Sequence, residues 1–213
     1  MKATIPDRGS LAKEYFERYE QYQEIVDWLR RDLDDLLNRD GVRAIVRARI
    51  KSFEGCYQKI LRKCKSFGNS SLYLSINDLL GLRIVCPFLE DLKAVECILK
   101  RNYSISQIER KGNGHNFREF GYESTHLLLH VPELMYTCYS FKNPVVAEVQ
   151  LRTILQDAWA EIEHQLVYKT GAEGTVQVVR RKLAAINATL TLLDLDIQEL
   201  RNVEEHTSTS SQD

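Results

Sequence analysis

The sequence predicts an α+β fold, in which a mixed or antiparallel sheet of about four or five strands is flanked by helices at both ends of the chain. Two observations carry this prediction. Apolar residues recur at helical spacing near both termini, whereas the middle of the chain contains short segments rich in β-branched and aromatic residues, which are typical of strands. The 213 residues, 44% of them hydrophobic, are enough for one sizeable core and too few for two ordinary catalytic domains.

The N-terminal part is expected to be helical. Apolar residues follow one another in steps of four and three, which predicts one helix over residues 11–38. A second helix is expected from Ser52 to Cys64, with Ser52 as its N-cap. This region also carries a dense run of basic residues, with Glu54 as the one acid among them. Either a solvated helix face or an anion site fits such a run. Its basic members are Arg43, Arg47, Arg49, Lys51, Lys59, Arg62, Lys63 and Lys65.

The middle of the chain alternates strands with a helix and a loop. A helix is expected at 89–101, and a glycine-bearing polar loop lies before Gly121. The predicted strands are 82–88, 103–109, 124–131 and 145–151.

The C-terminal part is again expected to be helical. A helix over 153–169 follows the last strand and, after a break, a final helix begins near Thr175. Apolar residues up to Leu200 step by four and three, which favours self-association through this helix. The alternative is packing on the N-terminal helix of the same chain. The tail, 206–213, is expected to be disordered.

Composition excludes several classes of protein. The formal net charge is −1, so nothing draws the whole chain towards nucleic acid or a membrane, and an anion site must come from local clustering. The five cysteines include no CxxC pair, which fits free thiols in a reducing cytoplasm. The chain starts without an apolar signal segment, and no 18 apolar residues follow one another. We therefore expect a cytoplasmic protein with no membrane association.

Two carboxylates stand out. Asp78 lies where a short helix passes through Gly81 into a strand, and Glu148 lies inside an otherwise apolar strand. A charged side chain in an apolar strand is tolerated only where it points out of the core or binds a ligand. Taken singly, Asp78 is a helix cap or turn acid and Glu148 a solvent-facing residue. Together with the basic run, they have the residue types that phosphoryl-type transfer requires, which are Mg²⁺ ligands and cations for a polyphosphate.

Four motifs, in order, resemble those of the RelA/SpoT-type alarmone synthetases. They are RIKSFEGCYQK, DLLGLRIV, GYESTH and EVQLRT followed by AEIEHQLVYK. The resemblance runs from Arg49 to Lys169 and is closest to the small, single-domain type. One departure is Gly55, where the family commonly has serine.

The resemblance implies a fold, an activity and substrates. A nucleotidyltransferase-like synthetase core would span 41–170, between an N-terminal helix in 1–40 and a C-terminal helix in 171–205. The activity would be that of a GTP diphosphokinase, which transfers the β,γ-pyrophosphate of ATP to the 3′-hydroxyl of GDP or GTP with Mg²⁺ as cofactor.

The same resemblance assigns roles to residues. Asp78 and Glu148 would be the catalytic carboxylates, with Asp78 as Mg²⁺ ligand and Glu148 as base or metal ligand. Arg49, Lys51 and Lys59 would contact the ATP phosphates, with Lys63 as a lesser candidate. Arg83 would bind a nucleotide or phosphate, and Tyr122 would stack on guanine. The remaining nucleotide-binding positions that the resemblance implies are His126, Gln150, Arg152, His164 and Lys169. Gln150 and Arg152 share a strand face with Glu148 because alternate side chains point together. Lys111 and Arg118 both remain candidates for the 5′-phosphates of the acceptor.

Three alternatives to this activity differ in what they need. Alarmone hydrolysis is not expected, because the chain has no His-Asp dipeptide. A toxin-like pyrophosphokinase acting on tRNA 3′ ends would need a further basic patch, and none is visible, so nucleic acid is not an expected partner. A non-catalytic guanine-nucleotide sensor would not need both Asp78 and Glu148. Whichever activity holds, we expect the chain to form a homo-oligomer through its helices.

Overall fold

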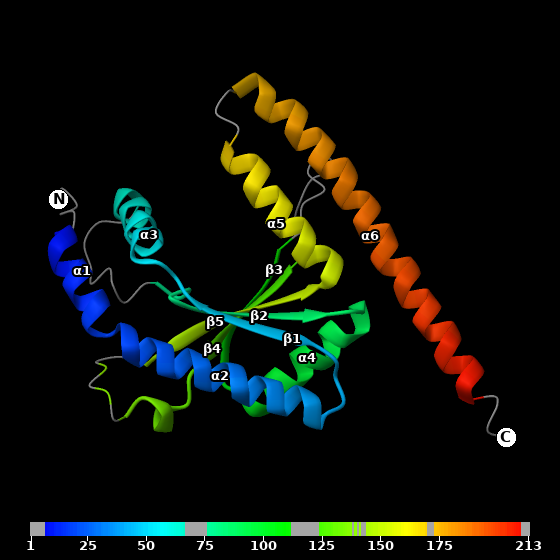
Figure 1. Ribbon diagram of the computed structural model, residues 1–213, viewed down its shortest axis with the longest axis horizontal. Helices are drawn as coiled ribbons and strands as arrows, with labels where there is room; N and C mark the ends of the chain where they lie inside the picture. The colour runs from blue at the N-terminus through cyan, green and yellow to red at the C-terminus, as the bar shows by residue number, and fades with distance from the viewer. Residues whose placement is uncertain are drawn as a thin grey trace.

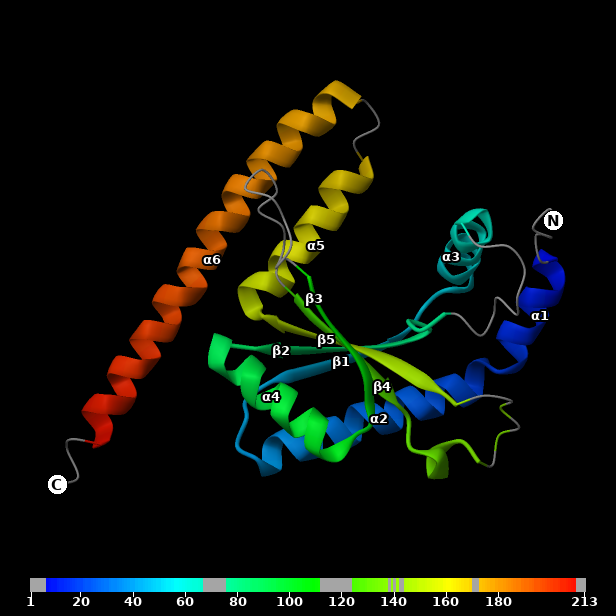
Figure 2. The same cartoon turned by 180° about the vertical axis from the view of Figure 1, so that it is seen from behind.

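A computed structural model of the chain describes residues 7–66, 76–111, 124–137, 139, 141, 144–169 and 173–209. Figures 1 and 2 show it from opposite sides. The helices and strands are α1 (Arg8–Glu17), α2 (Tyr19–Arg39), β1 (Ile45–Ile50), α3 (Phe53–Ser66), β2 (Leu80–Cys86), α4 (Leu89–Asn102), β3 (Ile105–Lys111), β4 (Ser124–His130), the short 3-10 helix η2 (Glu133–Met135), β5 (Val146–Thr153), α5 (Ile154–Lys169) and α6 (Glu173–Thr209).

The strands form one mixed sheet in the order β1-β2-β5-β4-β3. β2 and β5 are parallel, and the other neighbours are antiparallel. The predicted α+β class is therefore confirmed. β1 was not among the expected strands, because its sequence IVRARI was read as part of the basic run. The alternation of Arg47 and Arg49 with Val46, Ala48 and Ile50 is the period of a strand with one polar face.

The two faces of the sheet differ in character. One face is apolar and packs on α2 and α4, which lie beneath the sheet in Figure 1. The buried side chains there include Leu82, Ile84, Leu127, Val149 and Leu151, each at most 2% exposed. The opposite face carries charged and polar residues, and α5 and α6 rise from that side. Burial of one face thus leaves the other available for chemistry.

The expected helix over 11–38 is two helices. α1 ends at Glu17 and α2 begins at Tyr19, with Arg18 between them in a non-ideal helical conformation (φ −105°, ψ 0°). The apolar stripe is continuous in sequence, but its residues belong to two separate clusters of buried side chains. Tyr15 packs against α3, whereas the α2 residues from Tyr22 onwards pack on the sheet. The predicted N-cap of α3 is confirmed, since Ser52 Oγ accepts a hydrogen bond from the Gly55 amide at 3.2 Å.

The final helix packs on α5 and α4, so the alternative of packing on the N-terminal helix is wrong. Its inward face is largely polar. Asp194 is 4% exposed and accepts a 2.8 Å hydrogen bond from Thr153 Oγ1, and the Gln198 side chain accepts from the Glu90 amide at the start of α4. Apolar residues such as Leu200 instead point to solvent. α6 continues to Thr209, into the segment expected to be a tail.

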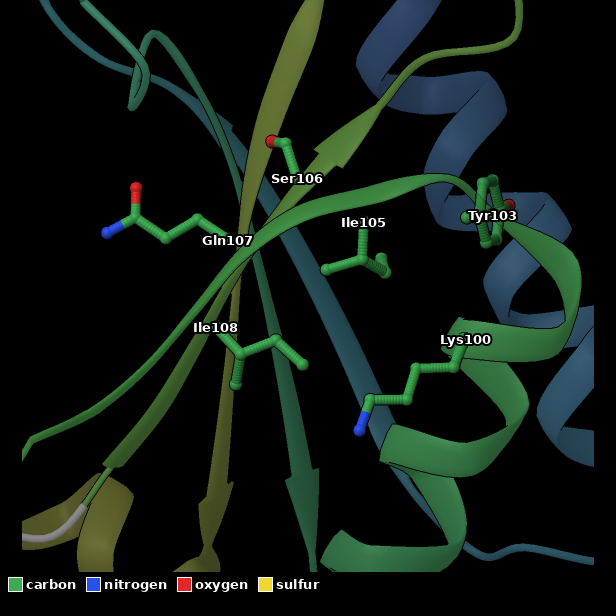
Figure 3. A pocket seen from close by; sticks show the side chains of 6 residues that line it. All are labelled: Lys100, Tyr103, Ile105, Ser106, Gln107 and Ile108. Carbon is green, nitrogen blue, oxygen red and sulfur yellow. The ribbon is translucent and has the colours of Figure 1, made fainter.

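A hollow of about 280 Å³ lies at the outer edge of β3, away from the residues expected to bind nucleotides. Figure 3 shows Gln107 pointing away from α4, whereas Ile105 and Ile108 lie on the side that faces it. Lys100, its charged lining residue among those described, is already paired with Glu96 at 2.7 Å. This hollow therefore has little to offer an anionic ligand.

Within the described part of the chain, no helix is both long enough and apolar enough to cross a membrane.

Candidate active site

Strand pairing places most of the expected site residues in one row on the polar face. Arg49 and Glu148 both lie opposite Gly81, and Gln150 lies between Arg83 and His126 on the neighbouring strands. Directly paired residues share a face, so four strands contribute to one surface. Gly81 leaves this surface open beside Arg49, because it carries no side chain.

Asp78 joins this surface just before β2 and holds two lysines. Lys51 Nζ lies 2.9 Å from Asp78 Oδ2, and Lys59 Nζ lies 2.9 Å from Oδ1. Lys59 thus forms an ion pair with the second carboxylate oxygen, so both oxygens of Asp78 face an ammonium group. Burial raises the pKa of Asp78, but the two lysines outweigh it and the net effect lowers that pKa. Asp78 is therefore ionised at neutral pH and retains acceptor capacity.

Glu148 is bound on both oxygens. His126 Nδ1 lies 3.1 Å from Oε1, and Gln150 Nε2 donates to Oε2 at 2.9 Å. The hydrogen bond from His126 is the main reason why the pKa of Glu148 falls to about 2, against the opposing effect of burial. His126 is 8% exposed, and its Nε2 is buried without a hydrogen-bond partner among the residues that the structure describes. Glu148 is therefore held in its ionised form by neighbours on β4 and on its own strand.

The arginines of the polar face converge on a residue that the sequence did not indicate. Asp157, in the first turn of α5, receives Arg83 Nη1 at 2.8 Å and Arg152 Nη1 at 3.3 Å on Oδ1. Arg47 Nη1 approaches Oδ2 at 3.3 Å, and Glu161 lies 3.6 Å from Arg83. Three guanidinium groups thus share two carboxylates, which leaves the cluster positively charged. The available signal was an acid in the first turn of the helix that directly follows a strand with an arginine near its end.

A pocket of about 290 Å³ opens beside this cluster. Three arginines contribute to its walls, and cations of this kind suit a phosphate-bearing ligand. The lining residues are Arg47, Ala48, Arg49, Gly81, Leu82, Arg83, Gln150 and Glu161. Arg152 is only 7% exposed and faces Asp157, so it supports the pocket from beneath and does not line it.

Other expected residues lie further away or outside the described part of the chain. His164 follows Asp157 by seven residues, so it lies on the same face of α5 about two turns along, where it is exposed. Lys169 ends α5. Tyr122 and Arg118 lie outside the described residues, as do the side chains of Lys63, Lys111 and Lys169.

Asp78 and Glu148 also fit a magnesium ion. Mg²⁺ prefers oxygen ligands and is commonly held by one or two carboxylates together with substrate phosphates. Asp78 Oδ1 is buried and lies 2.9 Å from Lys59 Nζ, so a metal ion there would replace one cation with another. The hydrogen bond from His126 lowers the pKa of Glu148 most, and the negative charge of Asp78 opposes that shift. In the part of the chain that is described, no group of three or more His, Cys, Asp or Glu side chains could hold a metal.

Comparison with known proteins identifies the family. The sequence profile of the region found in RelA and SpoT proteins matches residues 48–173. GTP pyrophosphokinase YwaC of Bacillus subtilis is 32% identical over 123 residues, which are 58% of this chain and 57% of that protein. GTP pyrophosphokinase YjbM of the same organism is 29% identical over 127 residues, 60% of this chain and 58% of that protein.

The crystal structure of the small alarmone synthetase 1 from Bacillus subtilis has the same fold, with a TM-score of 0.73 at 25% identity over 91% of this chain and 99% of that chain. The chain spans somewhat more than half the length of the two pyrophosphokinases that it matches. The family region covers more than half of the chain and includes all five strands except the start of β1. The chain therefore belongs to the RelA/SpoT family.

Proposed function

We propose that this chain is a GTP or GDP pyrophosphokinase, an ATP:GTP 3′-diphosphotransferase that makes (p)ppGpp. The 3′-oxygen of the acceptor ribose attacks the β-phosphorus of ATP, the bond from the α-phosphate to the β-phosphorus breaks, AMP leaves and the hydroxyl loses its proton. The observation that carries this proposal is the pair of lowered-pKa carboxylates, Asp78 with its two lysines and Glu148 on the polar face of the sheet, on which Arg49 and Arg83 also lie. The relatives named GTP pyrophosphokinase support it.

The donor half of the site would lie at the β1, β2 and α3 side. Arg49 and Arg83 line the pocket, and Lys51 and Lys59 stand beside it on Asp78. Cations from these elements would neutralise the ATP phosphates, which is the main requirement of phosphoryl-type transfer. Arg47 joins them as a residue that the motif comparison did not assign.

The acceptor half would lie towards β4 and α5. His126 presents its buried Nε2, and Gln150 reaches both Glu148 and the pocket. Tyr122 precedes β4 and would stack on the guanine, with His164 and Lys169 of α5 at its border. Arg152 would act through Asp157, and the choice between Lys111 and Arg118 for the acceptor phosphates stays open.

The role of Glu148 follows from its charge. A carboxylate whose pKa is about 2 remains ionised at neutral pH but is a weak proton acceptor. The loose transition state of phosphoryl transfer needs little base strength. Glu148 therefore serves mainly to orient the 3′-hydroxyl and to bind metal, rather than as a strong base. Mg²⁺ held by Asp78 and Glu148 would offset negative charge on the polyphosphate.

One experiment tests the proposal against its alternatives. Purified protein is incubated with γ-labelled ATP and Mg²⁺, and with GDP, GTP or uncharged tRNA as acceptor. Transfer of label to GDP or GTP, with release of AMP, is the expected result. Label on tRNA alone would identify a toxin-like enzyme, and guanine-nucleotide binding without transfer would identify a sensor. Either outcome would reject the proposed activity.

Removal of the proposed stacking ring should weaken acceptor binding selectively. Stacking of a base on an aromatic side chain contributes about 1 to 3 kcal/mol, so Tyr122→Ala should raise the KM for GDP about 5- to 150-fold. The KM for ATP should change little. Both constants are measured beside a melting curve. A parallel rise of both constants with a lower melting temperature would instead indicate that the ring packs in the core.

Self-association through α6 remains a prediction, and the structure offers a better probe than Leu190, which is half-buried. Leu193 is 43% exposed on the outward stripe of α6. Because a buried unpaired charge is costly, Leu193→Glu should lower the mass measured by light scattering. Leu134→Glu, at an 85% exposed leucine of η2, is the matched control and should leave the mass unchanged. An unchanged mass for Leu193→Glu would remove α6 from the interface.

A further inference from the structure

The N-terminal helix reaches the donor lysines through one buried hydroxyl. Tyr15 of α1 is 2% exposed, and its hydroxyl donates a 2.9 Å hydrogen bond to the main-chain carbonyl of Lys51. Cys56 Sγ makes a weaker contact of 3.7 Å with the same oxygen. Lys51 in turn places its ammonium group 2.9 Å from Asp78. The chain of contacts therefore runs from α1 to the candidate metal ligand through a single residue.

The main chain of Lys51 is held on both sides. Its amide donates to the Leu79 carbonyl at 2.8 Å, which extends the pairing of β1 with β2, and its carbonyl accepts from Tyr15. Lys51 lies in the short connection between the end of β1 and the start of α3. A lysine side chain has a flexible four-carbon stem, so the place of its ammonium group depends on how firmly the main chain is fixed.

The same helix also packs against α3, which carries Lys59. Tyr15, Cys56, Ile60 and Ile76 form a small buried cluster that is separate from the main core. Figure 2 shows α1 and α3 side by side at one end of the molecule, and contacts between the two helices agree with that view. Arg8 of α1 adds an exposed ion pair of 2.9 Å to Glu54. Ile60, directly after Lys59, is 1% exposed and anchors that turn of α3.

We infer that α1, which lies outside the matched family region, positions the donor side of the site, and that Tyr15 is the positioning residue for Lys51. This inference rests on the proposed function. Tyr15 itself does not touch substrate, because its ring and hydroxyl are buried against the main chain. Burial raises the pKa of Tyr15 to about 12, so the hydroxyl remains a donor at any physiological pH.

Tyr15→Phe tests the inference because it keeps the ring in its cluster and removes only the hydroxyl. The KM for ATP should rise about three- to tenfold, the range expected for one lost intramolecular hydrogen bond. The KM for GDP should change less than about twofold, well below the tenfold that 1.4 kcal/mol represents. Affinity for a non-hydrolysable ATP analogue, measured by calorimetry with Mg²⁺, should fall by the same factor as the KM for ATP rises.

The matched control is Tyr103→Phe. Tyr103 is also buried, at 8% exposure, and its hydroxyl donates to Asp32 of α2, on the far side of the sheet from the donor lysines. This variant should lose stability in a melting curve while both KM values and analogue affinity stay at wild-type levels. A merely structural role of Tyr15 would make the two variants behave alike.

The outcomes separate the inference from the proposed function. Unchanged ATP KM and analogue affinity in Tyr15→Phe, or equal losses for ATP and GDP, overturn the inference while wild-type transfer upholds the function. If the wild type transfers no pyrophosphate but binds the analogue, the function fails and the affinity of the variant still decides the role of Tyr15. A wild type that neither transfers nor binds the analogue overturns both.

Discussion

Glu148→Gln is expected to reduce pyrophosphate transfer by about 100-fold or more, a loss typical of groups that position a nucleophile or bind a catalytic metal. The amide keeps the size of the side chain and can still accept from His126 Nδ1. It carries no negative charge, so it is a poor ligand for Mg²⁺ and a poor acceptor for the 3′-hydroxyl. The loss should therefore appear in kcat, with little change in the fold.

The same variant should change how stability depends on pH. The folded state lowers the pKa of Glu148 from 4.5 to about 2, chiefly through the hydrogen bond from His126. A lowered carboxyl pKa stabilises the protein above the unfolded value of 4.5, and this contribution is lost as the pH falls towards 2. Thermal melting between these limits should thus be less steeply pH-dependent in Glu148→Gln than in the wild type.

Glu109→Gln is the matched control for both measurements. Glu109 lies on β3 directly opposite His126, on the same face of the sheet, but is exposed. Its replacement should leave turnover within about twofold, since its side chain is exposed and is not among the groups proposed to bind substrate or metal. Turnover of Glu148→Gln near the wild-type level would remove Glu148 from the reacting centre, whatever its effect on melting.

The parts of the fold that depend on local pattern could be predicted from the sequence. β2, β4 and β5 are apolar enough to be recognised, and α4 has a clear helical period. β1 was not predicted as a strand because its two arginines suggested a solvated helix face, although they alternate with apolar residues. The polar face that these arginines share is formed only when β1 pairs with β2, which contributes further residues to the same surface.

Features that depend on packing between distant segments could not be predicted in the same way. The break at Arg18 arises because α1 turns to meet α3, a contact that no periodicity encodes. The role of Asp157 requires arginines from three strands to meet one turn of α5. α6 places Asp194 and Gln198 inward, where Thr153 and the start of α4 provide partners. Several leucines of the same helix therefore face solvent, namely Leu192, Leu193, Leu195 and Leu200. Sequence spacing alone favours the opposite orientation.

Asp78→Asn should separate metal binding from phosphate binding. Asp78 holds Lys51 and Lys59 through contacts of 2.9 Å. Without its charge, both lysines would be released to meet phosphate groups, while one of the two proposed carboxylate ligands for Mg²⁺ would be lost. We therefore expect kcat to fall about 100-fold or more, whereas affinity for a non-hydrolysable ATP analogue without Mg²⁺ should be kept or improved.

The decisive measurement is a titration of Mg²⁺ for both turnover and analogue binding. In the wild type, Mg²⁺ should raise both; in Asp78→Asn, added Mg²⁺ should restore neither kcat nor the metal-dependent part of the affinity. Asp34→Asn removes an ion pair of 2.9 Å with Arg30 on α2, outside the site, and should respond to Mg²⁺ as the wild type does. If Asp78→Asn kept wild-type turnover and Mg²⁺ dependence, Asp78 would be only a counter-ion for the two lysines. Loss of analogue affinity with and without Mg²⁺, together with a lowered melting temperature, would assign it instead to holding α3 against the sheet.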